Sequence, residues 1–449
     1  MLKITRTNLG QMAAAFAIKI AAGATSYILF VGLARYLGPG LFGTFSVLFS
    51  IAMVAGLAGS FGQQVFIVKE TAVARRGANV EYEKGIYLFS AIVTLTVGSA
   101  FALAAGIAAA AHVDLPLKTV DLVLLSSLSF LYAVTQSTIG ALRAQDKVLY
   151  AIFSRDVLWR LLAGGAITYL LLSEAESELT IALGVLVAPL CVIALSHVHM
   201  VWKTVRALRN GVKIRIKRWL DTSFGMSIIA VIAGSDTYLF TVILAVVATE
   251  TETGAFFASM RTVDVINMFM IATTLISANR LSKAIAGGQH REFQGICNFL
   301  ILVQLIPVLA VCGILAIFAE PVLCLFSSEY VEYGPILRLL SLGVAINALT
   351  GPTGLAMQIA GLHWLQVFYQ GGALALCLLA LPLSYTNFGL EGAAMSFIVS
   401  KTAWNVLAVW TLATQKSVNV SIVGLLGTSE IPSKDVIKGL KSQMSQRIR

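Results

Sequence analysis

Apolar residues fill the chain in long runs, and short polar segments separate these runs. Twelve of the runs are close to the roughly 17 to 25 residues that an α-helix needs to cross the hydrocarbon core of a bilayer. They lie at 12–33, 41–62, 86–111, 120–142, 153–172, 179–202, 222–248, 255–279, 295–318, 335–360, 364–384 and 391–413. The pattern therefore predicts an all-α polytopic membrane protein with about 12 transmembrane helices.

The composition agrees with a membrane protein and excludes an ordinary soluble domain. Hydrophobic residues make up 58% of the 449 residues and charged residues 12%, whereas about a quarter of a soluble domain is charged. The five cysteines lie in or beside apolar runs without metal-ligand spacing, which favours buried thiols at helix interfaces. No catalytic triad, nucleotide loop or metal cluster is visible in the sequence, which therefore predicts no catalytic residue, metal or cofactor.

The basic residues predict the orientation in the membrane. Of the 32 Lys and Arg residues, 25 lie at the N-terminus, in the even-numbered connections or in the tail, whereas the odd-numbered connections hold only Arg35 and Lys118. By the positive-inside rule, both termini are cytoplasmic. This topology accounts for the net charge of +10 without a nucleic-acid partner, and anionic membrane lipid is the expected partner of the basic sixth connection, 203–218.

The two halves of the chain resemble each other. GTFSVLFS at 43–50 aligns with GAFFASMR at 254–261, an offset of 211, and the segment 140–153 aligns without gaps to 355–368, an offset of 215. Chance alignment of Leu, Ala and Gly is the alternative explanation. A repeat predicts two parallel-related six-helix lobes with a substrate path between them. The expected domains are an N-terminal lobe (1–210), the end of a basic cytoplasmic linker (211–221), a C-terminal lobe (222–414) and a basic cytoplasmic tail (415–449).

Several short motifs carry a family likeness. They are RYLGPGLFGTFS at 35–46, GQQV at 62–65, ALRAQDK at 141–147, SDTYLF at 235–240, TGAFFASMR at 253–261 and SSEYVEYGPILRLLSL at 327–342. In order and spacing, the chain resembles the polysaccharide transporter family, the Wzx-type O-antigen and exopolysaccharide flippases. That family belongs to the multidrug/oligosaccharidyl-lipid/polysaccharide exporter superfamily.

The resemblance implies a transporter of the bacterial inner membrane, not an enzyme, with its two lobes around a central cavity. Its cargo would be an undecaprenyl-pyrophosphate-linked oligosaccharide, moved from the cytoplasmic to the outer leaflet by alternating access. A proton or sodium gradient is the driving force that the superfamily implies. A polysaccharide polymerase and a chain-length regulator are further candidate partners.

Five basic residues lie inside apolar runs, where a charge is costly unless it meets water or a partner. A cavity for a lipid pyrophosphate needs such cations, because Lys and Arg form charge-assisted hydrogen bonds with phosphate oxygens. Lys19, Arg261 and Lys401 are the candidate cavity cations. Arg160 and Arg338 are weaker candidates, since Arg160 follows Asp156 by four residues and Arg338 lies near acidic residues at the outer end of its run.

Two of the three main candidates also have a structural explanation, whereas Lys401 has no acid nearby in the sequence. Lys19 could extend to the inner face, and Arg261 could pair with Asp264 on the same helix face or with Asp236. The two acids, Asp236 and Asp264, are the candidate coupling-ion residues, because a carboxylate in a low-dielectric bundle can exchange a proton near neutral pH. For Asp236, a static salt bridge with Arg261 is the alternative.

A Gly-Pro cluster predicts a hinge in the tenth apolar run. Pro352 lies between Gly351 and Gly354, and a proline inside a membrane helix removes a backbone hydrogen bond. A static bend is the alternative.

Two other classes of protein compete with the flippase. A cation-coupled multidrug extruder would need an acidic cavity, yet basic residues outnumber acids five to two among the deep positions. A membrane-embedded polysaccharide polymerase would be expected to carry a large outer loop, yet the longest predicted outer connections are only about a dozen residues.

Overall fold

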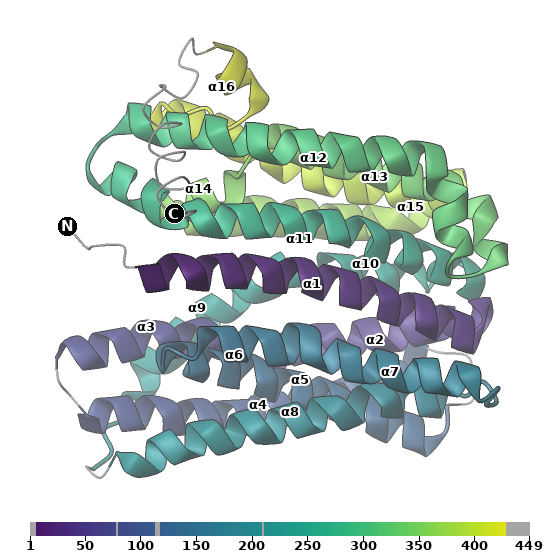
Figure 1. The fold of residues 1–449 in the computed structure, drawn as a ribbon, viewed down its shortest axis with the longest axis horizontal. Coiled ribbons are helices and arrows are strands. Elements are labelled where there is room, and N and C mark those ends of the chain that lie inside the picture. Colours follow the sequence, from purple (N-terminus) through teal and green to yellow (C-terminus); the bar gives the residue numbers. More distant parts are fainter. Residues whose placement is uncertain (1–5, 78–79, 113–116, 209–210, 428–449) are drawn as a thin grey trace.

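Every regular element is a helix in the computed structural model, which describes residues 6–77, 80–112, 117–208 and 211–427 (Figure 1). The first eight α-helices are α1 (Arg6–Leu37), α2 (Pro39–Gly59), α3 (Gln63–Arg76), α4 (Val80–His112), α5 (Thr119–Ala144), α6 (Val148–Phe153), α7 (Trp159–Leu172) and α8 (Leu179–Ala207). The others are α9 (Ile216–Gly234), α10 (Asp236–Leu244), α11 (Glu250–Ala286), α12 (His290–Cys324), α13 (Gly334–Thr350), α14 (Thr353–Ile359), α15 (His363–Lys416) and α16 (Ile422–Gly427).

The helices account for the twelve predicted spans. Within the described residues, nine helical segments are long and apolar enough to cross a membrane, and the bent pair α9 and α10 makes a tenth. The long helix α15 contains two of the predicted spans, because Gly389 breaks its helical geometry with a φ of 57°. The remaining span, Val148–Leu172, consists of α6, a π-helical turn at Ser154–Leu158 and α7, and it carries three charged residues.

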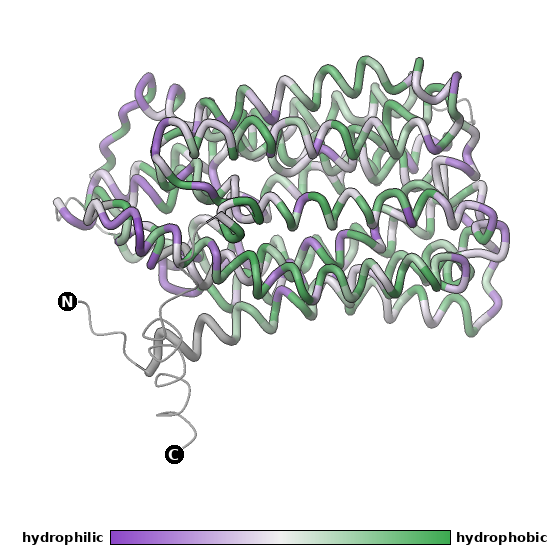
Figure 2. Tube along the Cα trace, turned by 90° about the horizontal axis from the view of Figure 1, so that it is seen from above, coloured by the Kyte–Doolittle hydropathy of each residue, from purple (hydrophilic) through white to green (hydrophobic). Residues whose placement is uncertain are grey.

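The helices form two groups that meet along α1, α2 and α10 (Figure 1). One group contains α4, α5, α7 and α8, and the other contains α11, α12, α13 and α15. Helix α2 packs against α4 and α5 of the first group and against α11 of the second, while α1 packs against both α7 and α11. Hydrophobic positions dominate the length of the helices, and hydrophilic positions gather at the two ends of the bundle (Figure 2). The fold is therefore an all-α membrane bundle of two lobes.

Glycines aligned by the repeat meet where the two lobes cross. A Cβ atom added to Gly43 of α2 would lie 1.9 Å from the carbonyl oxygen of Glu250 in α11, and one added to Gly254 would lie 3.2 Å from the Cα atom of Gly43. The backbones of α2 and α11 can approach this closely only because both positions lack a side chain. Gly43 and Gly254, which the 211-residue offset aligns, thus face each other.

The second aligned pair of segments also has matching geometry. Asp146 and Gly361, which differ by the offset of 215, both have a left-handed backbone, with φ values of 60° and 78°. A helix begins two residues later in each case, at Val148 and His363. Each segment therefore makes the same kind of turn between two helices, and the internal likeness extends to local structure.

Several predicted boundaries differ from the observed ones. Gly38 alone separates α1 from α2, and its φ of 75° lets the chain turn before Pro39, so both helices extend beyond the predicted spans 12–33 and 41–62. The predicted span 335–360 is two helices, α13 and α14, because Gly351 and Pro352 interrupt it. The tail after residue 427 lies outside the described residues.

Replacing Gly43 with alanine should destabilise the protein by about 1–3 kcal/mol, because the new methyl group would collide with backbone atoms that cannot rotate away. Unfolding of the purified protein in detergent measures the change. Gly184→Ala in α8 is the matched control, since a Cβ there meets no atom within 4 Å. Equal stability of the two variants would contradict the close crossing of α2 and α11.

Candidate functional site

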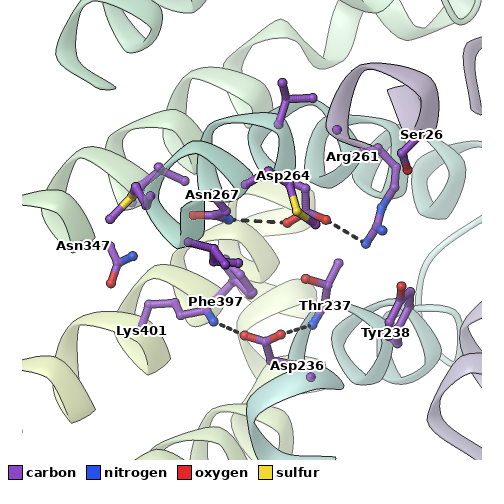
Figure 3. A pocket seen from close by; sticks show the side chains of 18 of the residues that line it. Ser26, Asp236, Thr237, Tyr238, Arg261, Asp264, Asn267, Asn347, Phe397 and Lys401 are labelled. Atoms are coloured by element: carbon purple, nitrogen blue, oxygen red, sulfur yellow. Dashed lines mark hydrogen bonds and ion pairs between the residues drawn. The ribbon is translucent and has the colours of Figure 1, made fainter. Parts of the chain in front are cut away.

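A cavity of about 360 Å³ lies where the two lobes meet (Figure 3). Residues of α1, α7, the α9–α10 junction, α11, α13 and α15 line it. Its polar lining residues include Ser26, Arg160, Asp236, Thr237, Tyr238, Arg261, Asp264, Asn267, Asn347 and Lys401. Charged groups from both halves of the sequence thus reach one central space.

A broken helix supplies one wall of this cavity. Helix α9 ends at Gly234 and α10 begins at Asp236, with an angle of 63° between the two helices. Glycine weakens a helix, and an aspartate at the first position of a new helix is stabilised by the positive end of the helix dipole. One carboxylate oxygen of Asp236 accepts a hydrogen bond from the backbone nitrogen of Thr237 at 2.9 Å. The break therefore holds the Asp236 carboxylate at the cavity wall.

Lys401 of α15 forms an ion pair with Asp236. The sequence suggested Arg261 as the partner of Asp236, so the observed partner is a different cation, far along the chain. Beyond Lys401, the side chain of Asn405 donates to the Lys401 carbonyl oxygen at 2.9 Å and to the Asn347 side chain at 2.8 Å. Thr353, at the start of α14, donates to the Asn405 side chain. A continuous polar chain therefore leads from the cavity to the break between α13 and α14.

Arg261 is buried and is held within the C-terminal lobe. Its guanidinium group lies 3.1 Å from the Asp264 carboxylate, three residues along α11, as the sequence suggested. The guanidinium carbon also lies 4.7 to 5.7 Å from the ring centres of Phe30, Tyr238 and Phe257, within the range of cation–π attraction. Phe30 belongs to α1, so Arg261 contacts both lobes.

A second group of charges lies in the N-terminal lobe, around the π-helical turn. Lys19 of α1 and Arg155 each lie 2.6 Å from the Asp156 carboxylate. Arg155 also donates to the side chain of Gln136 in α5. Arg160 donates to the backbone carbonyl of Asp156 and stacks on the Trp159 ring, at 5.5 Å from its centre. Arg155 and Asp156 belong to the π-helical turn, and their side chains are only 17% and 7% exposed, so the turn directs both toward the bundle interior.

The two groups differ in net charge. In the C-terminal lobe, Arg261 and Lys401 each have a carboxylate partner, so four charges balance. In the N-terminal lobe, Lys19 and Arg155 share the single carboxylate of Asp156, and Arg160 donates to the backbone carbonyl of the same residue. In the described part of the chain, Arg160 is the cavity-lining cation that forms no salt bridge with a carboxylate. The site therefore carries an excess of positive charge on its N-terminal side.

The structure brings five of the seven predicted charged residues to the cavity: Arg160, Asp236, Arg261, Asp264 and Lys401. Lys19 is not among the lining residues, because its ammonium group pairs with Asp156. Arg338 lies away from the cavity and forms a bidentate pair with Glu320 at 2.6 and 2.8 Å, rather than with the acids at 329 and 332.

Sequence reasoning missed two charged residues of the site. It placed Arg155 in a cytoplasmic connection and treated Asp156 only as a partner of Arg160. The available signal was the grouping of three charges within 155–160, at the start of an apolar run.

The predicted hinge residues form a sharp break rather than a bend within one helix. Gly351 has a φ of 73°, and a Cβ atom there would lie 2.0 Å from the carbonyl oxygen of Val420. Pro352 then precedes α14, whose second residue is Gly354. The break is fixed by close packing against the segment after α15, and whether it moves stays a prediction.

Three solved structures are similar to this chain over nearly its whole length. A multidrug resistance transporter of the MATE family, in the MOP superfamily, has in its inward-facing conformation a TM-score of 0.69 and 15% identity, covering 93% of this chain and 99% of that one. An outward-facing structure bearing the same description has a TM-score of 0.61 and 14% identity, with coverages of 93% and 96%. A MOP superfamily transporter from Pyrococcus furiosus has a TM-score of 0.61 and 14% identity, with coverages of 90% and 95%.

This chain has the fold of the MOP superfamily transporters. No protein-family model and no curated protein matches it by sequence. Identities of about 15% show the fold and not the cargo. The fold agrees with the predicted architecture of two six-helix lobes around a central cavity.

The ion pair between Asp236 and Lys401 can be tested with a double-mutant cycle. Asp236→Asn and Lys401→Met should each destabilise the protein, because each leaves one charge without its partner. The double variant should lose less than the sum of the two, with a coupling of about 0.5–3 kcal/mol. Denaturant unfolding in detergent gives the three values. Strictly additive losses would mean that the two side chains do not interact.

Proposed function

We propose that this protein is a membrane transporter, not an enzyme, and that it moves its cargo by alternating access between the two lobes. The observation that carries this proposal is the charged cavity at the junction of the lobes, beside the broken helix of α9 and α10. Discontinuous helices at the interface of structural repeats are typical of transporter binding sites. Rocking of one lobe against the other would expose such a cavity to each side in turn.

The contacts between the lobes support an inward-facing state. At the end of the bundle that contains Gly38, the side chain of Arg35 donates to the Leu325 carbonyl at 2.6 Å, and the hydroxyl of Tyr330 donates to the Pro39 carbonyl at 2.9 Å. By the positive-inside rule this end faces outward, so these bonds close the outer side. The higher TM-score with the inward-facing structure, 0.69 against 0.61, agrees with this assignment.

For the cargo we propose two classes, and the fold comparisons favour the first. In a cation-coupled multidrug extruder, the cavity would take amphiphilic drugs and exchange them for a cation. Two of the similar structures are described as multidrug resistance transporters. Asp236 and Asp264 would provide the carboxylates for a cationic drug or a coupling ion.

The second cargo class is an undecaprenyl-pyrophosphate-linked oligosaccharide, and one specific observation favours it. Arg160, Arg155 and Lys19 give the N-terminal side of the site an excess of positive charge, which suits a phosphate group. The description of the Pyrococcus furiosus transporter states that reversed polarity of its binding pocket suggests a different function. The family likeness of the sequence points the same way, to a flippase.

The location of the protein in the cell and its further partners are also part of this proposal. The chain is a multi-pass membrane protein, and we place it in the bacterial inner membrane with both termini in the cytoplasm, from its basic connections. If the cargo is lipid-linked, a polysaccharide polymerase and a chain-length regulator would act on the product.

Two assays in deletion strains separate the cargo classes. A flippase predicts that lipid-linked oligosaccharide repeat units accumulate in the cytoplasmic leaflet when the gene is deleted, and that drug susceptibility does not change. An extruder predicts greater drug susceptibility in a host that lacks its own pumps, with no such accumulation. Normal results in both assays would refute both cargo classes.

Arg160→Gln should reduce transport of an anionic cargo by about tenfold to a hundredfold, because a charge-assisted hydrogen bond to phosphate contributes about 1.5–3 kcal/mol. Complementation of the deletion strain measures the rate. Arg338→Gln removes an equal charge outside the cavity and should stay within about twofold of wild type. Full activity of Arg160→Gln would remove this residue from the binding site.

Asp264→Asn tests gradient coupling in proteoliposomes. Asp264 is partly exposed in the cavity, where its carboxylate is placed to hold a coupling cation, whereas asparagine carries no charge. The variant should keep exchange of cargo for cargo but lose accumulation driven by an imposed gradient. Asp121→Asn, at the start of α5 and outside the cavity, is the control. Unchanged accumulation by Asp264→Asn would exclude it as the coupling residue.

A further inference from the structure

A second cavity, of about 210 Å³, lies within the N-terminal lobe and shares no lining residue with the central cavity. Its walls come mainly from α4, α5 and α8. Helices α4 and α8 both pack against α5, and they lie at the edge of the bundle away from α12 (Figure 1). The cavity is therefore a pocket in the membrane-facing side of this lobe.

Apolar side chains dominate the pocket and continue to its open side. Leu95, Val198 and Trp202 line it and are 56%, 45% and 59% exposed, so its mouth is open to the surrounding lipid. The hydroxyl groups of Thr94 and Ser137 in its lining hydrogen-bond to each other at 2.7 Å, so neither requires a polar ligand. This interior suits a hydrocarbon chain and offers little to a sugar or a drug with polar groups.

The end of the pocket nearest the basic connections carries positive charge. Arg206 follows the lining residue Trp202 by one helical turn in α8, and Lys84 precedes the lining residue Leu88 by one turn in α4. Helices α4 and α8 thus each carry a basic residue at the end of the bundle that the positive-inside rule assigns to the cytoplasm. Trp202 itself has the amphipathic ring that is enriched at membrane interfaces.

Polar atoms without partners lie at the same end. The side chain of Tyr87 lines the pocket, and its hydroxyl lies near Thr71 and Gln145. Within the described residues, the hydroxyls of Tyr87 and Thr71 and the amide nitrogen of Gln145 are buried but complete no hydrogen bond of good geometry. Thr71 and Gln145 are not lining residues, so these atoms lie behind the wall of the pocket and not at its open side.

We propose that this pocket binds an anionic phospholipid of the inner leaflet. One acyl chain lies between α4 and α8, and the phosphate group lies beside Arg206 and Lys84. Basic pockets between transmembrane helices on the cytoplasmic side are a recurrent type of site for anionic lipid head groups. The pocket is separate from the central cavity, so its ligand is a bound membrane lipid and not the transported cargo.

Native mass spectrometry of the purified full-length protein tests the head group. Phosphatidylglycerol should bind more tightly than phosphatidylcholine with the same acyl chains. Arg206→Gln should weaken phosphatidylglycerol binding by about fivefold, since one such charge contributes about 1 kcal/mol. Lys283→Gln, an equal change of charge at the end of α11, should leave binding unchanged. Equal binding of the two lipids, or equal effects of the two variants, would overturn the proposal.

The acyl chain is tested separately by filling the pocket. Ala91→Trp, in the lining, should abolish the preference for phosphatidylglycerol, whereas Ala100→Trp, on the exposed side of the same helix, should retain it. If Ala91→Trp fails to fold, lipids brominated in the middle of the acyl chain replace it as the test. The brominated lipids should quench the tryptophan fluorescence of the wild-type protein more than that of the Trp202→Phe variant. Equal quenching in the two proteins would mean that no acyl chain occupies the pocket. Preferential binding of undecaprenyl phosphate that Ala91→Trp abolishes would make the pocket a cargo site and overturn the assignment.

Discussion

A charged side chain inside a bilayer requires an opposite charge, a polar group or water, and this requirement organises the centre of the molecule. Within the described residues, the carboxylates of Asp156, Asp236 and Asp264 lie in salt bridges, and each has a different kind of partner. Asp264 is paired within one helix, Asp236 joins α10 to α15, and Asp156 joins the π-helical turn to α1. The pairs of Asp236 and Asp264 line the central cavity, whereas the pair of Asp156 lies beside it within the N-terminal lobe.

Close backbone packing is the second constraint, and it fixes the position of the charges. Helix α2 can lie against α11 because Gly43 and Gly254 lack side chains. This crossing sets the distance between the lobes near Phe30 and Phe257, which enclose the Arg261 guanidinium. A steric feature at one end of the bundle thus determines the environment of a charge nearer its centre.

The sequence was sufficient to predict the spans, because the apolar runs are long and the bilayer imposes their length. It also offered the pair of Arg261 with Asp264 as one of two alternatives, since a spacing of three residues on a helix places both on one face. The pair of Lys401 with Asp236 could not be predicted, because nothing local relates residues that are 165 apart. Arg155 was missed for another reason, since charge counting assigns a basic residue at the edge of an apolar run to the adjacent loop. The amino-acid composition of Ser154–Leu158 does not indicate the π-helical turn that places Arg155 in the bundle.

The arrangement of charges also determines how cargo and coupling ion would be related. In the proposed cycle, a cationic cargo would compete with the coupling ion for the carboxylate of Asp236 or Asp264, so the two would cross the membrane in opposite directions. An anionic cargo would instead be favoured by a cation that occupies Asp236, because Lys401 would then be released to bind the anion. By linkage, the anion would in turn favour binding of that cation. Arg160 differs from both pairs, since an anion can reach it without displacing a carboxylate. The direction of coupling would therefore depend on the charge of the cargo, and the same side chains would permit either direction.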